Sequence, residues 1–220
     1  MEIKIIASGS TGNCYLVNDG RTKILLDAGV KFKEIQRALD FHTNDIDACL
    51  LTHEHGDHIR SLRELTRRGI KTLPTYLSTY PHPFHKAIGT FIVENFSAVH
   101  DVPCVGYMLD SLETEESLLY ATDTAELPTS YKQFTHLLVE ANYSEKILYA
   151  NMAAGEINPS LGERIIETHL SIEKLTVWLE SLDLTRLRQI YLLHLSDRNS
   201  NAVEFKRQIQ ELTGAEVYTA

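Results

Sequence analysis

Short apolar blocks alternate with clusters of turn-forming residues along the first third of this chain, which is typical of strands joined by tight turns. These blocks predict strands at Ile3–Ala7, Cys14–Val17, Lys23–Leu26 and Ile46–Leu51. Asn18-Asp19-Gly20 separates the second strand from the third and favours a hairpin. Phe32, Ile35 and Leu39 recur at helical spacing, so we predict a helix over Phe32–Leu39.

Strands and helices are also predicted for the rest of the chain. Ile59, Leu62, Leu65 and Thr66 indicate a helix that ends at Gly69. Further strands are predicted at Lys71–Leu77, Thr90–Val93, Ser97–Val99, Gly106–Leu109, Leu118–Ala121, His136–Glu140, Gln189–Leu193 and Glu216–Tyr218. Further helices are predicted at Glu145–Met152, Ser171–Leu182 and Asn201–Leu212. This order indicates an α/β fold in which two sheets lie between helical layers, within a single domain over residues 1–220.

Composition limits the classes of protein that this chain can represent. Its 220 residues suit one domain, and 43% hydrophobic with 23% charged residues is ordinary globular usage. The apolar runs are too short to span a bilayer, so no membrane association is expected. Met1–Ser8 carries an acid beside a short apolar run, which favours a first strand over a signal peptide. The net charge of −9 argues against broad, non-specific binding to nucleic acid but does not exclude a local site.

The three cysteines are Cys14, Cys49 and Cys104, and they form no Cys-x-x-Cys pair. Because their number is odd, a disulfide framework is not expected, and reduced thiols in the cytosol fit better. Each one lies in or beside an apolar segment. We therefore interpret them as small buried hydrophobic residues.

A cluster of metal-binding side chains follows the predicted strand Ile46–Leu51: His53, His55, Asp57 and His58. In an extended segment, residues two apart point the same way, so His53 and His55 can offer two imidazoles to one metal ion. Asp57 and His58 lie where the chain turns into the next helix and can serve a second ion. The mixture of imidazole and carboxylate suits zinc, manganese or iron. An exposed polar loop without metal is the alternative interpretation.

Further candidate ligands follow three later strands at their ends: His100, Asp123 and His194. A lone histidine at such a position is usually a surface residue. Their occurrence in series downstream of the histidine cluster indicates instead that they complete a metal site.

The ordered set His53-x-His55-x-Asp57-His58, His100, Asp123 and His194 resembles the ligand set of the metallo-β-lactamase superfamily, over nearly the whole chain. The resemblance implies a four-layer αββα sandwich that binds two divalent metal ions, zinc or manganese, with iron as a further option. It implies that His53, His55 and His100 hold the first ion, that Asp57, His58 and His194 hold the second, and that Asp123 bridges them. Metal-bound hydroxide would be the nucleophile, since two cations lower the pKa of water, and Asp57 would count among the catalytic residues.

The turn within Ala7–Cys14, Ser-Gly-Ser-Thr-Gly-Asn, resembles the YycJ/WalJ-like branch of this superfamily, whose members are regarded as cytosolic DNA exonucleases. Ser8, Ser10 and Asn13 are therefore candidate contacts of a substrate phosphate, together with Ser196 in the later motif His-Leu-Ser. A plain tight turn, which the glycines of this segment would suit, is the alternative interpretation.

Two later segments resemble RNase Z-like phosphodiesterases: His136–Asn142, which contains Glu140, and Thr168–Ser171, which contains His169. The resemblance implies that His169 protonates the leaving oxygen or stabilises charge on the phosphoryl group, and that Glu140 orients it. In the alternative interpretation Glu140 is an acid outside the site and His169 merely precedes the helix cap at Ser171.

Five cationic residues gather just after the histidine cluster: Arg60, Arg63, Arg67, Arg68 and Lys71. They can follow a phosphate backbone, or they can form an ordinary solvated helix face. The aromatic and Pro-rich segment Tyr80–His85 is interpreted as a lid, with His82 and His85 as surface residues.

From these features we expect a cytosolic phosphodiester hydrolase with DNA as its substrate and RNA as the alternative polymer. A small-molecule hydrolase of a thioester, lactone or cyclic phosphodiester on the same scaffold is the chief rival. A flavin- or iron-based oxidoreductase and a non-enzymatic binding module are the remaining alternatives.

Overall fold

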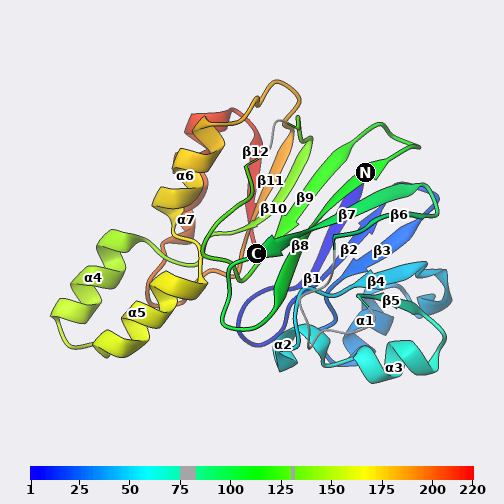
Figure 1. Ribbon diagram of the computed structural model, residues 1–220, viewed down its shortest axis with the longest axis horizontal. Helices are drawn as coiled ribbons and strands as arrows, with labels where there is room; N and C mark the ends of the chain where they lie inside the picture. The colour runs from blue at the N-terminus through cyan, green and yellow to red at the C-terminus, as the bar shows by residue number, and fades with distance from the viewer. Residues whose placement is uncertain (75–82, 130–131) are drawn as a thin grey trace. The chain divides into compact units, whose positions relative to one another are not determined.

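The computed structural model of the protein describes residues 1–74, 83–129 and 132–220, which fall into two compact units (Figure 1). Unit 1 comprises Met1–Ser97 and Val102–Glu116, and unit 2 comprises Ala98–Asp101 and Ser117–Ala220. Both units combine strands with helices, so the predicted α/β class is confirmed. Within the described ranges, no helix is both long enough and apolar enough to cross a bilayer.

Unit 1 contains a five-stranded sheet in the order β1-β2-β3-β4-β5. Its strands are β1 Glu2–Ala7, β2 Cys14–Asn18, β3 Lys23–Leu26, β4 Ala48–Leu50 and β5 Lys71–Leu73. β1, β2 and β3 pair antiparallel, whereas β3, β4 and β5 pair parallel. The chain therefore leaves β3 and β4 at the same edge of the sheet. Asp27 follows β3 at this edge, and the segment Thr52–His58 follows β4.

Short helices cover one face of this sheet (Figure 1): α1 Phe32–Ala38, α2 Gly56–Ile59 and α3 Leu62–Arg67, with a 3-10 turn η1 at Thr43–Asp45. Ile35 and Leu65 pack with Leu25 and Cys49 in one apolar core. Burial of each such large aliphatic side chain contributes roughly 1.5–3 kcal/mol. This core therefore fixes the ends of β3 and β4, from which the candidate site is built.

The remaining strands of unit 1 have the order β8-β7-β6, with bounds β6 His85–Ile88, β7 Phe91–Ala98 and β8 Cys104–Ser111. They are joined to the five-stranded sheet by side-chain hydrogen bonds. The hydroxyl of Tyr107 donates to the carbonyl oxygen of Leu51 at 2.5 Å. In the β2–β3 hairpin, the buried carboxylate of Asp19 accepts from the hydroxyls of Thr90 at 2.5 Å and Ser111 at 2.7 Å.

Unit 2 contains strands in the order β12-β11-β10-β9, all paired parallel. Their bounds are β9 Ser117–Ala121, β10 His136–Glu140, β11 Gln189–Leu193 and β12 Glu216–Thr219. Every residue of β9 and β10 is buried, which is the pattern of strands covered on both faces. Because the strands are parallel, Glu140 at the end of β10 lies at the same edge as Asp123 and His194, which follow β9 and β11.

The helices of unit 2 are α4 Glu145–Ala153, α5 Pro159–Thr168, α6 Ile172–Glu180 and α7 Ala202–Thr213. Figure 1 shows α6 and α7 running beside the strands of this unit. Leu175 and Leu179 form the buried face of α6, and Phe205 and Ile209 form the buried face of α7.

Several predicted element boundaries are wrong. Thr90–Val93 and Ser97–Val99 belong to one strand, β7, rather than two. The helix predicted after the histidine cluster is two, α2 and α3, because Ser61 leaves the helical conformation and its hydroxyl donates to the carbonyl of Val30. Lys71–Leu77 forms a strand only to Leu73, and residues 75–77 lie outside the described residues.

Three elements, η1, β6 and α5, were not predicted. Residues 80–82 of the proposed lid, which include His82, lie outside the described residues. Residues 83–85 are described, and the exposed His85 begins β6. α5 does carry a sequence signal, because Asn158 accepts from the backbone N–H of Ser160 and Pro159 occupies the first helical turn.

Candidate metal centre

The histidine cluster of unit 1 lies where β4 gives way to α2. His55 precedes the first turn of α2 in an extended conformation, with φ −63° and ψ 145°, and Asp57 and His58 lie within the helix. His53 and His58 are fully buried, whereas His55 and Asp57 are half-buried. The prediction that this motif passes from a strand into a helix is confirmed.

His53 and His55 direct nitrogen atoms toward one another. Nε2 of His53 lies 3.0 Å from Nδ1 of His55, with the rings nearly perpendicular at 81°. Two nitrogens that share a tetrahedral zinc ion, each about 2.0–2.1 Å from it, are about 3.3 Å apart. The spacing of this pair therefore fits a shared divalent cation.

Asp27 and Thr52 contact the Nδ1 atoms of two of these histidines. Neither Asp27 nor Thr52 was a candidate site residue in the sequence analysis. Nδ1 of His58 lies 2.8 Å from Oδ2 of Asp27, with both side chains fully buried. The Thr52 hydroxyl donates to Asp27 at 2.9 Å and lies 3.0 Å from Nδ1 of His53. Since its one proton goes to Asp27, Nδ1–H of His53 donates to it. The available signal was Asp27 itself, an acid that directly follows a buried strand.

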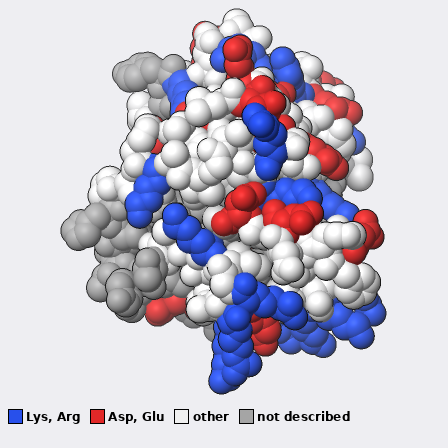
Figure 2. Space-filling view, turned by 90° about the vertical axis from the view of Figure 1, so that its right-hand side faces the viewer, with Lys and Arg blue, Asp and Glu red and all other residues white. Residues whose placement is uncertain are grey.

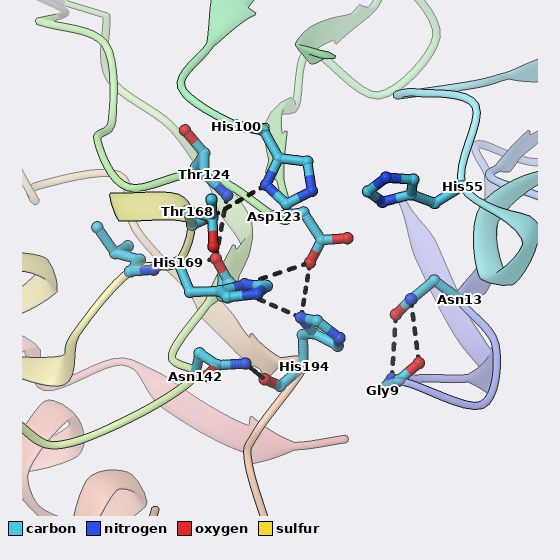
Figure 3. Close-up of polar contacts among 12 residues, drawn as sticks. Gly9, Asn13, His55, His100, Asp123, Thr124, Asn142, Thr168, His169 and His194 are labelled. Atoms are coloured by element: carbon cyan, nitrogen blue, oxygen red, sulfur yellow. Dashed lines mark hydrogen bonds and ion pairs between the residues drawn. The ribbon is translucent and has the colours of Figure 1, made fainter. Parts of the chain in front are cut away.

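Asn13, a predicted phosphate contact, is fully buried behind the same cluster. Its amide nitrogen donates to the carbonyl of Gly9 at 3.1 Å (Figure 3). The same nitrogen lies 3.0 Å from Nε2 of His58. Its amide oxygen accepts from the hydroxyl of Tyr15, and the oxygen of that hydroxyl lies 2.9 Å from the hydroxyl oxygen of Ser8. Ser10 is exposed. In this structure Asn13 therefore orders the turn, and the turn presents Ser10 and Thr11 to solvent.

The second cluster lies in unit 2 and unites three strand ends with a helix end. Asp123, Glu140 and His194 come from the ends of β9, β10 and β11, and His169 is the residue that ends α5. Each of the four offers a ligand atom, and these atoms lie within 4.8 Å of one another. Figure 3 shows the rings of His169 and His194 beside the Asp123 carboxylate.

Glu140 is the hydrogen-bonded centre of this second cluster. Its Oε1 lies 2.7 Å from Nδ1 of His169 and 2.8 Å from Nδ1 of His194. Its Oε2 accepts from the backbone N–H groups of Thr124 at 3.1 Å and Leu170 at 3.0 Å. Nδ1 of His194 also lies 2.6 Å from Oδ1 of Asp123. Both carboxylate oxygens of Glu140 are thus engaged, which suits a residue that orients others.

These contacts alter the acidity of the cluster. Burial alone would lower the pKa of His169, but the adjacent Glu140 carboxylate outweighs it and raises that pKa above its usual value. Burial likewise opposes the charge on His194, yet Asp123 and Glu140 hold its pKa well above the usual value. Burial would raise the pKa of Glu140, and the charge and hydrogen bond of His169 lower it instead.

His100 joins the unit 2 cluster from the segment that follows β7. Its Nδ1 lies 3.1 Å from the carbonyl oxygen of Thr168, and its Nε2 lies 3.1 Å from Oδ1 of Asp101. Its ring meets the ring of His169 edge-on, with centroids 5.6 Å apart. Burial is the main cause that lowers the pKa of His100, which favours the neutral form that binds metal.

One arrangement recurs in both units. Nδ1 faces an oxygen acceptor in each of His53, His58, His100, His169 and His194. A hydrogen bond from Nδ1–H fixes the tautomer, so that Nε2 carries the lone pair. Metal-binding histidines in proteins are commonly held in this way. The donor sets of both units therefore fit divalent transition metals.

Some of these side chains stand on strained backbone. Asp27, Asp123 and His194 have positive φ angles of 57°, 49° and 53°. Residues other than glycine adopt this left-handed conformation only at a cost, and such residues gather at functional sites. All three follow the end of a strand, where the strained residue turns its side chain toward the cluster.

Ser196, the last predicted phosphate contact, serves the turn that follows His194. Its hydroxyl accepts from the backbone N–H of Asn199 at 3.3 Å, and its own N–H donates to the carbonyl of Asn142. The structure thus assembles His53, His55, Asp57 and His58 in unit 1 and His100, Asp123 and His194 in unit 2, the latter together with Glu140 and His169.

Comparison with known proteins identifies the family. Residues 7–124 match the model of the metallo-beta-lactamase superfamily. The chain is 29% identical to the exodeoxyribonuclease WalJ of Streptococcus pneumoniae over 89% of this chain and 82% of that protein. It is 26% identical to the exodeoxyribonuclease YycJ of Bacillus anthracis over 91% of this chain and 84% of that protein.

Solved structures agree on the fold. The metallo-beta-lactamase fold protein YhfI of Bacillus subtilis superposes with a TM-score of 0.66 at 17% identity, over 99% of this chain and 95% of that one. The short form of human tRNase Z superposes with a TM-score of 0.64 at 13% identity, over 100% and 96%. The predicted fold class, the αββα sandwich, is thereby confirmed, and the chain belongs to the metallo-β-lactamase superfamily.

Proposed function

We propose that this protein is a metal-dependent phosphodiesterase that hydrolyses DNA. The observation that carries the proposal is the contact of Glu140 with His169, 2.7 Å apart, beside the candidate ligands Asp123 and His194. This contact positions His169 as a proton donor next to the candidate metal ligands. The choice of DNA is supported by the two relatives named as exodeoxyribonucleases, which align with most of this chain.

The seven predicted ligands, in this proposal, hold two divalent cations. His53, His55 and His100 take the first, Asp57, His58 and His194 take the second, and Asp123 serves both. Zinc and manganese suit this set of imidazoles and carboxylates, and iron is a further option. When bound, such cations make water acidic enough to attack near neutral pH and offset charge on phosphate oxygens. Asp57 is half-buried, with its Oδ2 3.7 Å from Nε2 of His58, and it would hold metal and orient the attacking water.

His169 and Glu140 have separate roles. Glu140 holds Nδ1–H of His169, so Nε2 of the protonated ring can donate a proton to the departing oxygen of the cleaved phosphodiester. Asn142 fixes the same region, because its amide donates to the backbone carbonyl of His194 at 2.8 Å. Ser8, Ser10, Asn13 and Ser196 remain proposed contacts of the substrate phosphate, with the exposed Ser10 the best placed to touch it.

A cytosolic location is part of the proposal. Cys14, Cys49 and Cys104 are free thiols, and all three are buried. Burial raises the pKa of the Cys14 and Cys49 thiols and keeps them unreactive. Free thiols of this kind are usual in a reducing compartment.

The proposal is tested by hydrolysis of end-labelled single- and double-stranded DNA and RNA with zinc, manganese or magnesium. We expect cleavage of DNA by the wild-type protein and none by His58→Ala. A thioester and a lactone are assayed in parallel. Hydrolysis of either one, with all four polymers left intact, would overturn the assignment in favour of a small-molecule hydrolase.

A further inference from the structure

The surface of helices α1 and α3 in unit 1 is strongly cationic, although the whole chain carries a net charge of −9. Residues 31–37 and 60–71 together hold eight Lys or Arg residues and only two acids, Glu34 and Glu64. Figure 2 shows Lys and Arg side chains gathered on the lower part of the face that it draws. We call Lys31, Lys33, Arg63, Arg67 and Arg68 the basic surface. Arg60 and Lys71 flank it along the chain.

The contact of α3 with α1 brings the two halves of this surface together. The guanidinium carbon of Arg68 lies 4.6 Å from the centre of the Phe32 ring. Lys31 and Lys33 are the immediate neighbours of Phe32, and Arg63 and Arg67 are one helical turn apart on α3. All five cationic side chains are exposed. They therefore form one surface that a single partner can contact.

These cations also lack the carboxylate partners that three other exposed arginines have. Elsewhere Arg207 pairs with Glu204 and Glu211, Arg164 pairs with Asp101, and Arg21 pairs with Glu113. None of the five residues of the basic surface forms an ion pair with any described residue. Arg63 and Arg67 repel each other at this spacing, which destabilises a helix slightly. A polyanionic partner would relieve that repulsion.

We propose that the basic surface binds the phosphate backbone of the DNA substrate. Asp57 and His58 lie in α2, and α3 begins only four residues after His58. DNA bound to the basic surface would therefore contact residues that are close in sequence to predicted metal ligands. The acidic remainder of the chain repels a polyanion and so directs it to this surface. The inference rests on the proposed function, since it assigns a binding surface to the part of the same DNA substrate that is not cleaved.

The test compares the double variant Arg63→Glu/Arg67→Glu with the control Lys146→Glu/Lys206→Glu. Both variants change the net charge equally, and Lys146 and Lys206 are exposed helix residues of unit 2. Binding of a labelled single-stranded oligodeoxynucleotide is measured by fluorescence anisotropy in a non-cleaving Asp57→Asn background, between about 50 and 200 mM salt. Binding of a labelled DNA duplex and of a labelled acidic peptide is measured in the same way.

For the Arg63→Glu/Arg67→Glu variant we expect DNA affinity to fall by about tenfold or more at the lowest salt. Its logarithmic salt slope should become shallower by about 1.4, because each lost phosphate contact to a single strand contributes about 0.7. The control should keep the slope. In the cleaving proteins, hydrolysis of the small diester bis(p-nitrophenyl) phosphate should be equal for all variants.

Three results separate the two proposals. Equal DNA affinity and equal slopes in both double variants, with DNA still cleaved, would overturn the role of the basic surface alone. Tighter capture of the acidic peptide than of DNA would overturn it in favour of a protein partner. Failure of the wild-type protein to cleave any polynucleotide would instead overturn the proposed function.

Discussion

Oδ2 of Asp27 lies 2.8 Å from Nδ1 of His58, and neither side chain is exposed to solvent. Asp27 stands at the end of β3, whereas His58 comes from α2, so this contact joins the sheet to the histidine cluster. It also fixes the proton of His58 on Nδ1 and keeps Nε2 as the basic nitrogen.

We therefore expect Asp27→Asn to weaken metal binding without removing a predicted ligand. Loss of an acceptor behind a metal-binding histidine commonly lowers metal affinity 10- to 100-fold, about 1.4–2.7 kcal/mol. Metal titration by calorimetry, with the metal content of the purified protein, measures the effect. The control is Asp45→Asn, which alters an exposed acid that forms an ion pair with Lys23, and this variant should bind metal as the wild type does. Unchanged affinity in Asp27→Asn would contradict this account of Asp27.

His169→Ala should impair catalysis rather than metal binding. If His169 donates a proton to the leaving oxygen, its removal should lower kcat for DNA cleavage by about 10²–10⁴-fold with little change in KM. Thioester hydrolysis, should any occur, needs no such donor and is expected to be insensitive. The control is His85→Ala, which removes an exposed histidine bound to Glu94. A loss of bound metal in His169→Ala would make it a ligand and refute the assigned role.

Gly29→Ala should disrupt the site through the backbone. A Cβ atom at Gly29 would lie 1.5 Å from the carbonyl oxygen of Asp57, so the loop that carries Asp57 must move. We expect a loss of about 3 kcal/mol or more in the free energy of unfolding, together with loss of metal. Gly56→Ala is a matched control between two predicted ligands, because its Cβ would meet nothing within 4 Å. Thermal unfolding should separate the two variants, and equal stabilities would show that the close approach at Gly29 is unimportant.

Asp19 should make unit 1 sensitive to acid. Burial would raise its pKa, but hydrogen bonds from Thr90, Thr22, Ser111 and Arg21 outweigh it and lower that pKa below the usual value. A carboxyl with a lowered pKa in the folded state stabilises the protein fully above its unfolded pKa of about 3.9. This contribution is lost as the pH falls through the folded value.

The corresponding variant is Asp19→Asn. Since hydrogen bonds to a charged group contribute about 1.5–3 kcal/mol, we expect it to be less stable than the wild type by about 2 kcal/mol at neutral pH. The difference should begin to shrink below a pH of about 4, where Asp19 of the unfolded chain gains its proton, and should vanish once the folded carboxyl is also protonated. Urea unfolding at several pH values measures both. A difference that stays constant with pH would rule out the charge of Asp19 as its source.

The sequence indicated which polar side chains stand at strand ends, but it misplaced the boundaries of some elements around them. The strand ends that carry Asp123 and His194 are apparent because continuous apolar runs stop at them. Asp27 has the same local pattern, but nothing in the sequence shows that it faces His58. Thr52 carries no signal beyond its position beside His53. Such partners depend on the parallel pairing of β3 with β4, which no local pattern specifies.

Local signals also explain the wrong boundaries. The turn between α2 and α3 depends on a hydrogen bond from Ser61 to the distant Val30. β6 pairs with β7, but its exposed His85, Lys86 and Ala87 lack an apolar run that would have indicated a strand. The seven metal ligands and the substrate contacts stay predictions, which the experiments above address.

The left-handed backbone at Asp27, Asp123 and His194 restricts how this centre can be re-engineered. Aspartate, asparagine, histidine and glycine tolerate that conformation, whereas β-branched residues are disfavoured. An exchange of donors at these positions is therefore easiest among Asp, Asn and His. A library that varies them should be limited to this alphabet, because other side chains would disturb the chain path before they altered metal preference.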